Sequence, residues 1–392
     1  MLAIVNAKIE TMKNGLLKNG KILIENGIIK NLGEDIKIPK KVEKIIDAKN
    51  RVVTPGLIEA HTHIGLNEIG IGTSGQDTNE STNPITPWCN VIDGINMKDK
   101  AFSYFRQAGI TSVNILPGSA NILGGKTTAV KCKSNIIDQA VLKKNTGMKA
   151  ALGENPKMLY SEKNESPSTR MGNAALMRET LTKAQNYMEK INNKNNEIEN
   201  LNYNREAEAL LPVLQKEVPL RIHCHRADDI ATAVRIAEEF DLKYTLEHIT
   251  QGYQIMDFLK QKDASFAIGP TMHYGSKVEN KGRNFHTPVL AAENNLEFCL
   301  TTDHPVVAGH YLAMTAGLAV NWGMERQKAL KAITLNAARH IGIENKIGSI
   351  EKGKDADLVI WSGDPLEFTT FADLTIIDGK IVYQREENHE IN

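Results

Sequence analysis

Two histidines at the end of a short apolar run are the first residues in the chain whose type and spacing suggest chemistry. His61 and His63 close the segment that begins at Gly56, and the turn signal Thr54-Pro-Gly56 precedes it. Alternate side chains of an extended strand share one face, so the two imidazoles should lie about 7 Å apart on one side. They can then bind one metal ion, although two ordinary histidines at a strand end would give the same pattern.

The elements that must position these histidines form a regular alternation. Apolar, strand-like runs alternate with helical patterns between residues 56 and 344, which is typical of a parallel sheet covered by helices. The runs lie at 56–65, 111–116, 127–132, 148–153, 220–224, 244–248, 264–268 and 297–302. The expected helices cover 98–108, 174–189 and 230–240. We therefore predict an α/β fold with a (β/α)8 TIM barrel, whose active site lies at the C-terminal ends of its strands.

Residue types that bind metals recur at those predicted strand ends. Any one of them could instead cap a helix or bond to a loop, but their convergence on one end of a barrel favours a metal site. The residues are His61, His63, Glu154, His223, His225, His248 and Asp303.

Both ends of the chain predict short strands separated by turns. Asn26-Gly27 and Asp378-Gly379 are hairpin signals between apolar runs. We expect a small β-sandwich domain built from residues 1–55 and 345–392, beside a barrel over 56–344.

Composition excludes several classes of function. The 47 basic and 47 acidic residues balance, so neither a nucleic-acid partner nor an anionic membrane is expected. No apolar stretch approaches the roughly 20 residues that span a bilayer, and we expect a soluble, cytoplasmic protein. The four cysteines have no CxxC spacing, which argues against a zinc ribbon or a disulfide framework.

Three segments carry a resemblance to a known family. They are Val53 to His63, Thr302-Asp-His-Pro305, and Gly348 to Ile360. Together they resemble the amidohydrolase superfamily, and within it the imidazolonepropionase- and prolidase-like amidohydrolases. The resemblance implies a small-molecule substrate, one or two divalent ions, most simply Zn with Fe, Mn or Co as alternatives, and a homo-oligomer as the family's habit.

The same resemblance implies roles for individual residues. His61, His63 and Asp303 would bind one metal, and His223 and His248 the second. His223 is preferred to His225, although both share one strand face and the choice stays open. His225 and Arg226 would then lie near the substrate.

A carboxylated lysine or a glutamate often bridges the two metals in such relatives, and the sequence offers Lys149 and Glu154. Thr146-Gly147 is a turn signal, so the strand should begin near Met148 and Lys149 should lie near its N-terminal end. Five residues further along, Glu154 would reach the C-terminal rim. We therefore expect Glu154 to be the ligand, with Lys149 as the alternative.

The loop from Gly269 to His286 is the expected site of substrate discrimination. It contains His273, Tyr274 and Arg283. A cationic loop suits a carboxylate-bearing substrate, but a solvated lid without specific contacts fits nearly as well.

The expected chemistry is hydrolysis of a C–N bond in an amide or cyclic amide. A bound divalent ion supplies hydroxide near neutral pH, and Asp303 can take the proton as general base and pass it to the leaving nitrogen, with His248 beside it. The alternatives are a single-metal deaminase of the same fold and a non-catalytic barrel that acts as a binding or scaffold protein.

Overall fold

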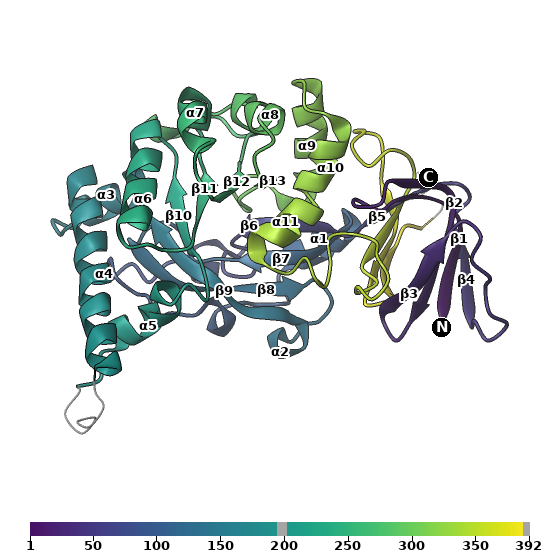
Figure 1. Ribbon diagram of the computed structural model, residues 1–392, viewed down its shortest axis with the longest axis horizontal. Coiled ribbons are helices and arrows are strands. Elements are labelled where there is room, and N and C mark those ends of the chain that lie inside the picture. Colours follow the sequence, from purple (N-terminus) through teal and green to yellow (C-terminus); the bar gives the residue numbers. More distant parts are fainter. Residues whose placement is uncertain (194–201, 387–392) are drawn as a thin grey trace.

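The computed structural model describes residues 1–193 and 202–386, and two sheets organise them (Figure 1). The larger part of the chain folds around a nearly closed barrel of eight strands, paired in the order β13-β12-β11-β10-β9-β8-β7-β6. Their bounds are β6 (Leu57–Thr62), β7 (Ile110–Ile115), β8 (Leu123–Lys131), β9 (Val141–Ala151), β10 (Leu220–Cys224), β11 (Tyr244–His248), β12 (Ser265–Ile268) and β13 (Phe298–Leu300). Each of the eight predicted runs overlaps one of these strands.

The third strand departs from the expected all-parallel barrel. β8 pairs antiparallel with both β7 and β9, whereas the other neighbouring strands of this sheet pair parallel. The connections explain the difference: residues 116–122 join β7 to β8, and residues 132–140 join β8 to β9. A parallel crossover needs a dozen or more residues, usually with a helix, so these short connections reverse the strand. The expectation of eight parallel strands is wrong at this position.

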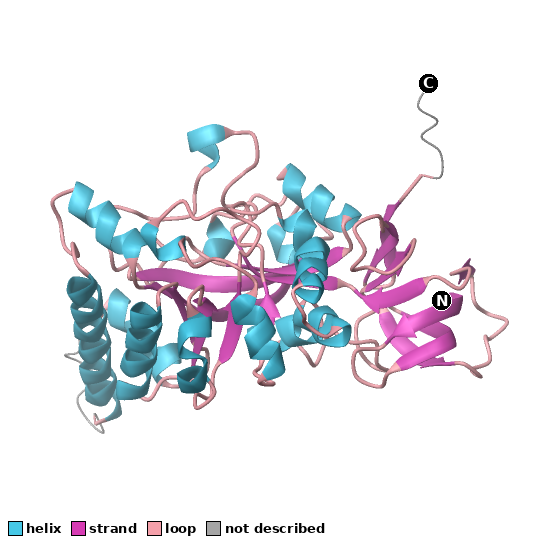
Figure 2. Ribbon diagram, turned by 90° about the horizontal axis from the view of Figure 1, so that it is seen from above, coloured by secondary structure: helices cyan, strands magenta, loops and turns pink. Residues whose placement is uncertain are grey.

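Helices cover the outside of the barrel strands, as Figures 1 and 2 show. The predicted helices at 98–108, 174–189 and 230–240 are confirmed as α1, α4 and α6. The helices are α1 (Lys100–Gln107), α2 (Ile137–Ala140), α3 (Glu154–Glu162), α4 (Arg170–Asn192), α5 (Arg205–Leu214), α6 (Ala227–Glu239), α7 (Met256–Leu259), α8 (His286–Glu293), α9 (Leu312–Asn321), α10 (Arg326–Ala332) and α11 (Leu335–Ile341). Their inward faces pack on the strands, as in α6, where Ile230, Val234 and Ala237 are buried.

A buried carboxylate connects the first and last barrel strands. Glu59 on β6 accepts hydrogen bonds from the backbone N–H of Thr302 at 2.9 Å and from its hydroxyl at 2.6 Å. The hydroxyl of Thr301 donates to the same carboxylate at 2.5 Å. Burial raises the pKa of Glu59 to about 7, although these hydrogen bonds oppose the rise. Glu59 thereby links the segment before His61 to the segment before Asp303.

Strands from both termini share the second sheet, whose purple and yellow strands lie at the right of Figure 1. Its order is β16-β15-β14-β5-β1-β2-β3, with β4 paired to β1. The bounds are β1 (Leu2–Glu10), β2 (Leu16–Glu25), β3 (Ile28–Gly33), β4 (Lys44–Asp47), β5 (Val52–Pro55), β14 (Leu358–Trp361), β15 (Ala372–Ile377) and β16 (Lys380–Gln384). The joint contribution of the two termini is as expected, while the sandwich architecture and the domain boundaries stay predictions. Residues 387–392 of the predicted domain lie outside the described residues.

One buried lysine connects the barrel to the terminal sheet. Lys131, the last residue of β8, has its ammonium 2.7 Å from Asp355, 3.0 Å from Asp357 and 2.5 Å from Asp378. Burial lowers the pKa of Lys131, but the three carboxylates outweigh it and hold that pKa above its ordinary value. Removing this one cation would leave several carboxylates without their partner.

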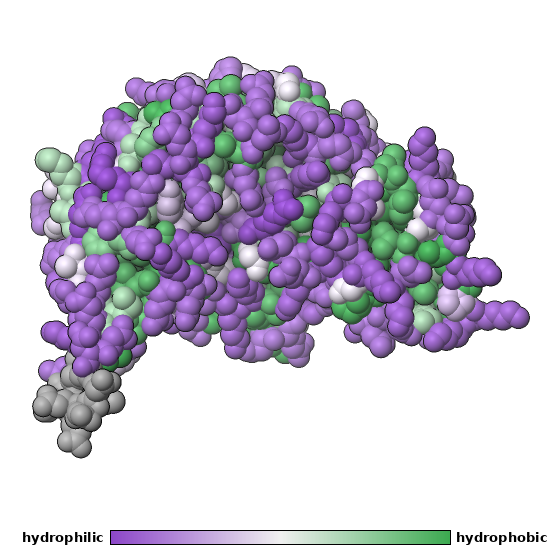
Figure 3. Space-filling model, in the orientation of Figure 1, coloured by the Kyte–Doolittle hydropathy of each residue, from purple (hydrophilic) through white to green (hydrophobic). Residues whose placement is uncertain are grey.

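The surface is mostly hydrophilic on the face shown in Figure 3, and hydrophobic residues appear there in separate patches. Large apolar side chains such as Phe102, Phe105 and Phe266 are instead buried inside the fold. Among the residues that the structure describes, no helix combines the length and the apolar character needed to cross a bilayer.

Candidate metal centre

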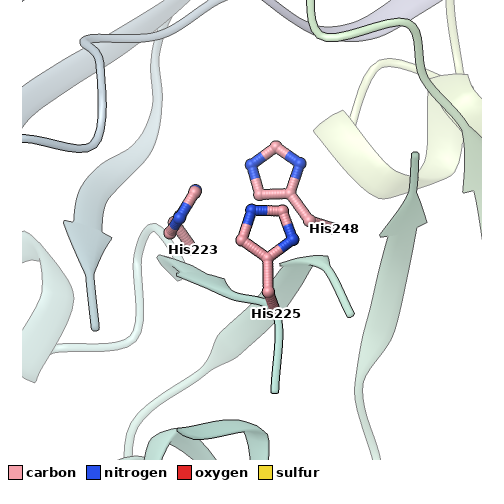
Figure 4. A group of neighbouring side chains, drawn as sticks. All are labelled: His223, His225 and His248. Atoms are coloured by element: carbon pink, nitrogen blue, oxygen red, sulfur yellow. The ribbon is translucent and has the colours of Figure 1, made fainter. Parts of the chain in front are cut away.

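Six of the predicted residues form two neighbouring groups at the C-terminal ends of the barrel strands. The first group is His61, His63 and Asp303, and the second group is His223, His225 and His248. Within each group, one potential ligand atom per residue lies within 4.8 Å of the others. Figure 4 shows the three imidazoles of the second group gathered above the ends of neighbouring strands.

His248, a member of the second group, also lies close to the first group. Its ring centroid is 4.5 Å from that of His223 and 4.7 Å from that of His61. It also stacks on His225, with centroids 4.9 Å apart and planes inclined by 19°. In the first group, Nε2 of His63 is 3.3 Å from Oδ1 of Asp303. The two groups therefore belong to one site.

Hydrogen bonds at Nδ1 fix the orientation of three imidazoles. His61 Nδ1 faces the Glu247 carboxylate at 2.8 Å, and His63 Nδ1 faces the carbonyl oxygen of Leu116 at 2.8 Å. His248 Nδ1 faces the carbonyl oxygen of Gly269 at 2.8 Å. Because each acceptor requires a proton on Nδ1, Nε2 keeps its lone pair, through which it can bind a cation.

The protonation states suit metal ligands. Burial lowers the pKa of His61, His223 and His225 well below the ordinary value, and it lowers that of His248 to about 4. These imidazoles are therefore neutral at pH 7. Burial raises the pKa of Asp303, but the adjacent imidazoles outweigh that effect and hold its pKa well below the usual range. Neutral imidazoles and an ionised carboxylate are the forms that bind divalent ions.

Unpartnered polar atoms also fit a cation at this site. Within the described parts of the chain, Oδ1 of Asp303 and Nδ1 of His223 are buried and have no hydrogen-bond partner. Such atoms are costly unless something pairs with them. The residues present therefore fit a divalent metal.

Lys149 lies beside the first group, contrary to the expected placement. β9 begins at Val141 and not near Met148, so Lys149 is two residues from the C-terminal end of its strand. Its Nζ is 3.0 Å from Nε2 of His61, and the side chain is completely buried. Burial lowers the pKa of Lys149 to about 8. The premise that the strand starts near residue 148 is wrong, because β9 pairs with β8 well before that point.

Glu154 lies outside both groups. It is the first residue of α3, and its carboxylate accepts a hydrogen bond from the backbone N–H of Glu279 at 3.1 Å. Its own backbone N–H donates to the Glu279 carboxylate at 2.7 Å. This reciprocal pair connects the end of β9 to the loop after β12, so Glu154 has a partner other than a metal.

The predicted substrate residues occupy different environments. His225 is part of the second group, whereas Arg226 forms an ion pair with Asp228 at 2.8 Å near the surface. Tyr274 is 94% exposed, and His273 makes a local contact with its carbonyl oxygen. Arg283 is partly buried in the same loop. The structure thus brings His225 to the site and leaves Arg226 and Tyr274 facing solvent.

Two buried acidic residues at the site escaped the sequence analysis. Glu247 orients His61, and Glu59 connects the strands that carry His61 and Asp303. Each is a charged residue inside an otherwise apolar strand. Since such residues are seldom buried without a partner, this pattern could have predicted that both have buried partners.

The chain combines a nearly closed barrel with two groups of candidate metal ligands at the C-terminal ends of its strands. Comparison with known proteins identifies the family to which such a chain belongs. Residues 52–382 match the amidohydrolase family, and the chain belongs to it. The crystal structure of an amidohydrolase from Thermotoga maritima MSB8 is 38% identical, has a TM-score of 0.95, and aligns over 98% of this chain and 100% of that one.

Two curated proteins are similar in sequence to most of this chain. The chain is 27% identical to the amidohydrolase tasK of Hapsidospora irregularis over 88% of its own length, but it spans only 38% of that protein. It is 23% identical to the imidazolonepropionase of Legionella pneumophila (strain Corby), over 88% of each chain.

Proposed function

We propose that the chain is a metal-dependent hydrolase that cleaves a C–N bond, in an amide or cyclic amide, of a small molecule. The observation that carries this proposal is the pair of candidate ligand groups, which His248 brings into contact with each other. Membership of the amidohydrolase family supports the same reaction class.

The residues that would hold the metal divide between the two groups. His61, His63 and Asp303 would bind one divalent ion, and His223 and His248 a second. Imidazole and carboxylate ligands suit zinc best, and iron, manganese or cobalt also fit. A bound divalent ion lowers the pKa of water towards 7 and polarises a carbonyl oxygen.

Asp303 is the proposed general base. Its carboxylate lies within 3.3 Å of Nε2 of His63 and within 3.8 Å of Nε2 of His61, so it borders the place where both imidazoles converge. It would accept a proton from water as the new C–O bond forms, and deliver that proton to the nitrogen as the C–N bond breaks. His248, whose Nδ1 is fixed by Gly269, would contribute from the other side as a ligand of the second ion through its Nε2.

We propose Lys149, in preference to Glu154, as the source of the bridging carboxylate. A neutral lysine amine adds carbon dioxide and releases a proton, which gives a carbamate. The buried Nζ at 3.0 Å from His61 and the pKa of about 8 both support this reaction. Incubation with 13C-bicarbonate should give a carbamate NMR signal that Lys149→Arg loses and Glu154→Gln retains. Absence of the signal from the parent would return the role to Glu154, and a signal unchanged in Lys149→Arg would show that Lys149 does not carry the carbamate.

Metal dependence tests the proposed function directly. Chelation should abolish turnover and divalent ions should restore it, with hydantoins, lactams, N-acyl amino acids and Xaa-Pro dipeptides as the substrate panel. Elemental analysis of active protein should find a transition metal, and less than about half an equivalent would contradict the proposal. Two bound ions would also disfavour a single-metal deaminase, and any turnover would exclude a purely binding protein.

A further inference from the structure

The loop of residues 269–286 covers the second group. Lys277 donates a hydrogen bond to the side-chain oxygen of Asn155, whose amide nitrogen is 3.5 Å from Nε2 of His223. Further along, a Cβ atom at Gly282 would lie 3.2 Å from the hydroxyl of Tyr253, which follows β11. The loop therefore reaches from the end of β9 to the segment after β11, across the strand ends that carry the second group.

Arg283 on this loop has no acceptor for its buried N–H groups. Within residues 1–193 and 202–386, its Nε and Nη1 are buried without a hydrogen-bond partner, and no carboxylate lies within ion-pair distance. Burial lowers its pKa, while Asp303 and Glu279 act in the opposite direction, so both carboxylates are near without pairing. A guanidinium has five N–H donors, and those on Nε and Nη1 are buried here without an acceptor, which is costly.

Lys277 adds a second cation on the same side of the site. The only hydrogen bond of its side chain in the described structure goes to the neutral side chain of Asn155, and no ion pair involves it. Neither cation forms an ion pair among the described residues, although the Glu279 carboxylate acts on both, so each retains donors for an anionic ligand.

We infer that the substrate carries a carboxylate group and that Arg283 binds it, with Lys277 as a second positive charge at the entrance. A carboxylate matches the planar fork of a guanidinium with two parallel hydrogen bonds. This inference rests on the proposed hydrolase and narrows its substrates to amides that bear a carboxylate, such as N-acyl amino acids or carboxylated cyclic amides. Arg283 is then a specificity residue, which binds the substrate away from the C–N bond.

Matched pairs of probes test the inference. Metal-loaded protein is titrated with N-acetyl amino acids and, separately, with the corresponding primary amides, and binding is read from the thermal-unfolding midpoint. At least one carboxylate should bind about tenfold or more tightly than its amide, because only the carboxylate forms charge-assisted bonds with Arg283. Arg283→Met should remove this preference, and Arg283→Lys should retain part of it.

Lys281→Met is the matched control, because Lys281 is an exposed cation of the same loop and should leave the preference intact. Metal content is measured in every variant, so a lost site is not mistaken for lost recognition. Equal binding of carboxylates and amides by the parent, tighter binding of inorganic phosphate, or an unchanged preference in Arg283→Met would each overturn the inference. Metal-dependent hydrolysis of uncharged lactams would then leave the proposed function standing.

Discussion

Replacing Glu247 by glutamine should weaken the metal centre without altering any candidate ligand. The Glu247 carboxylate is completely buried and lies 2.8 Å from Nδ1 of His61, 3.2 Å from Nε2 of His340 and 3.5 Å from Nη1 of Arg221. The hydroxyl of Thr245 also donates to it at 2.7 Å. Every neighbour is a donor, so the amide of glutamine can satisfy only part of the set.

The contacts of Glu247 allow the losses in metal affinity and in the free energy of unfolding to be estimated. Loss of a carboxylate that orients a ligating histidine reduces metal affinity by about 10- to 100-fold, which is roughly 1.4–2.7 kcal/mol. Removing one partner of a buried ion pair costs about 3–5 kcal/mol. Here Arg221 keeps its hydrogen bonds to the carbonyl oxygens of Thr146 and His340. We therefore expect the free energy of unfolding of the metal-free protein to fall by about 2–3 kcal/mol.

Two measurements separate the effect of Glu247→Gln on metal affinity from its effect on stability. Competition with a chelator of known affinity gives the metal affinity, and urea unfolding of the metal-free protein gives the stability. The control is Glu297→Gln, an exposed carboxylate just before β13, for which a change within about 0.5 kcal/mol is expected. Unaltered metal affinity in Glu247→Gln, with a folded protein, would refute the argument that this carboxylate orients His61.

Three further predictions concern the base, the buried lysine and a loop carboxylate. Asp303→Asn should retain its fold and lose about a hundredfold or more in turnover, and a rate within threefold of the parent would reassign the base. Lys131→Met should lower the free energy of unfolding by about 3–5 kcal/mol in urea melts, because Asp357 remains buried without its cation; a loss below about 1 kcal/mol would contradict this. Burial raises the pKa of Glu279 from 4.5 to about 7, so its contribution to stability is present at low pH and is lost as pH rises through 7. Glu279→Gln should remove that decline, which amounts to about 3 kcal/mol between pH 4.5 and 7, and an unchanged pH profile of the urea midpoint would count against it.

Local patterns in the sequence were enough to predict the main elements of the fold. The apolar runs marked each barrel strand, and the spacing of His61 and His63 predicted that they would share one face. Convergence at the strand ends follows from the barrel itself, which is why His223, His248 and Asp303 could be grouped with them in advance.

Only the tertiary structure decided the direction of one strand and the surroundings of the ligands. Whether β8 runs parallel depends on the length of its connections and on its pairing with β7 and β9, neither of which periodicity encodes. The bond between His61 and Glu247 joins residues 186 positions apart. Lys149 contacts His61 because of the way β9 pairs within the barrel, and this contact also joins distant segments. Glu154 likewise accepts its hydrogen bond from Glu279, which lies in the loop after β12. Contacts between distant segments arise from strand order and packing, so a sequence pattern read along the chain cannot determine them.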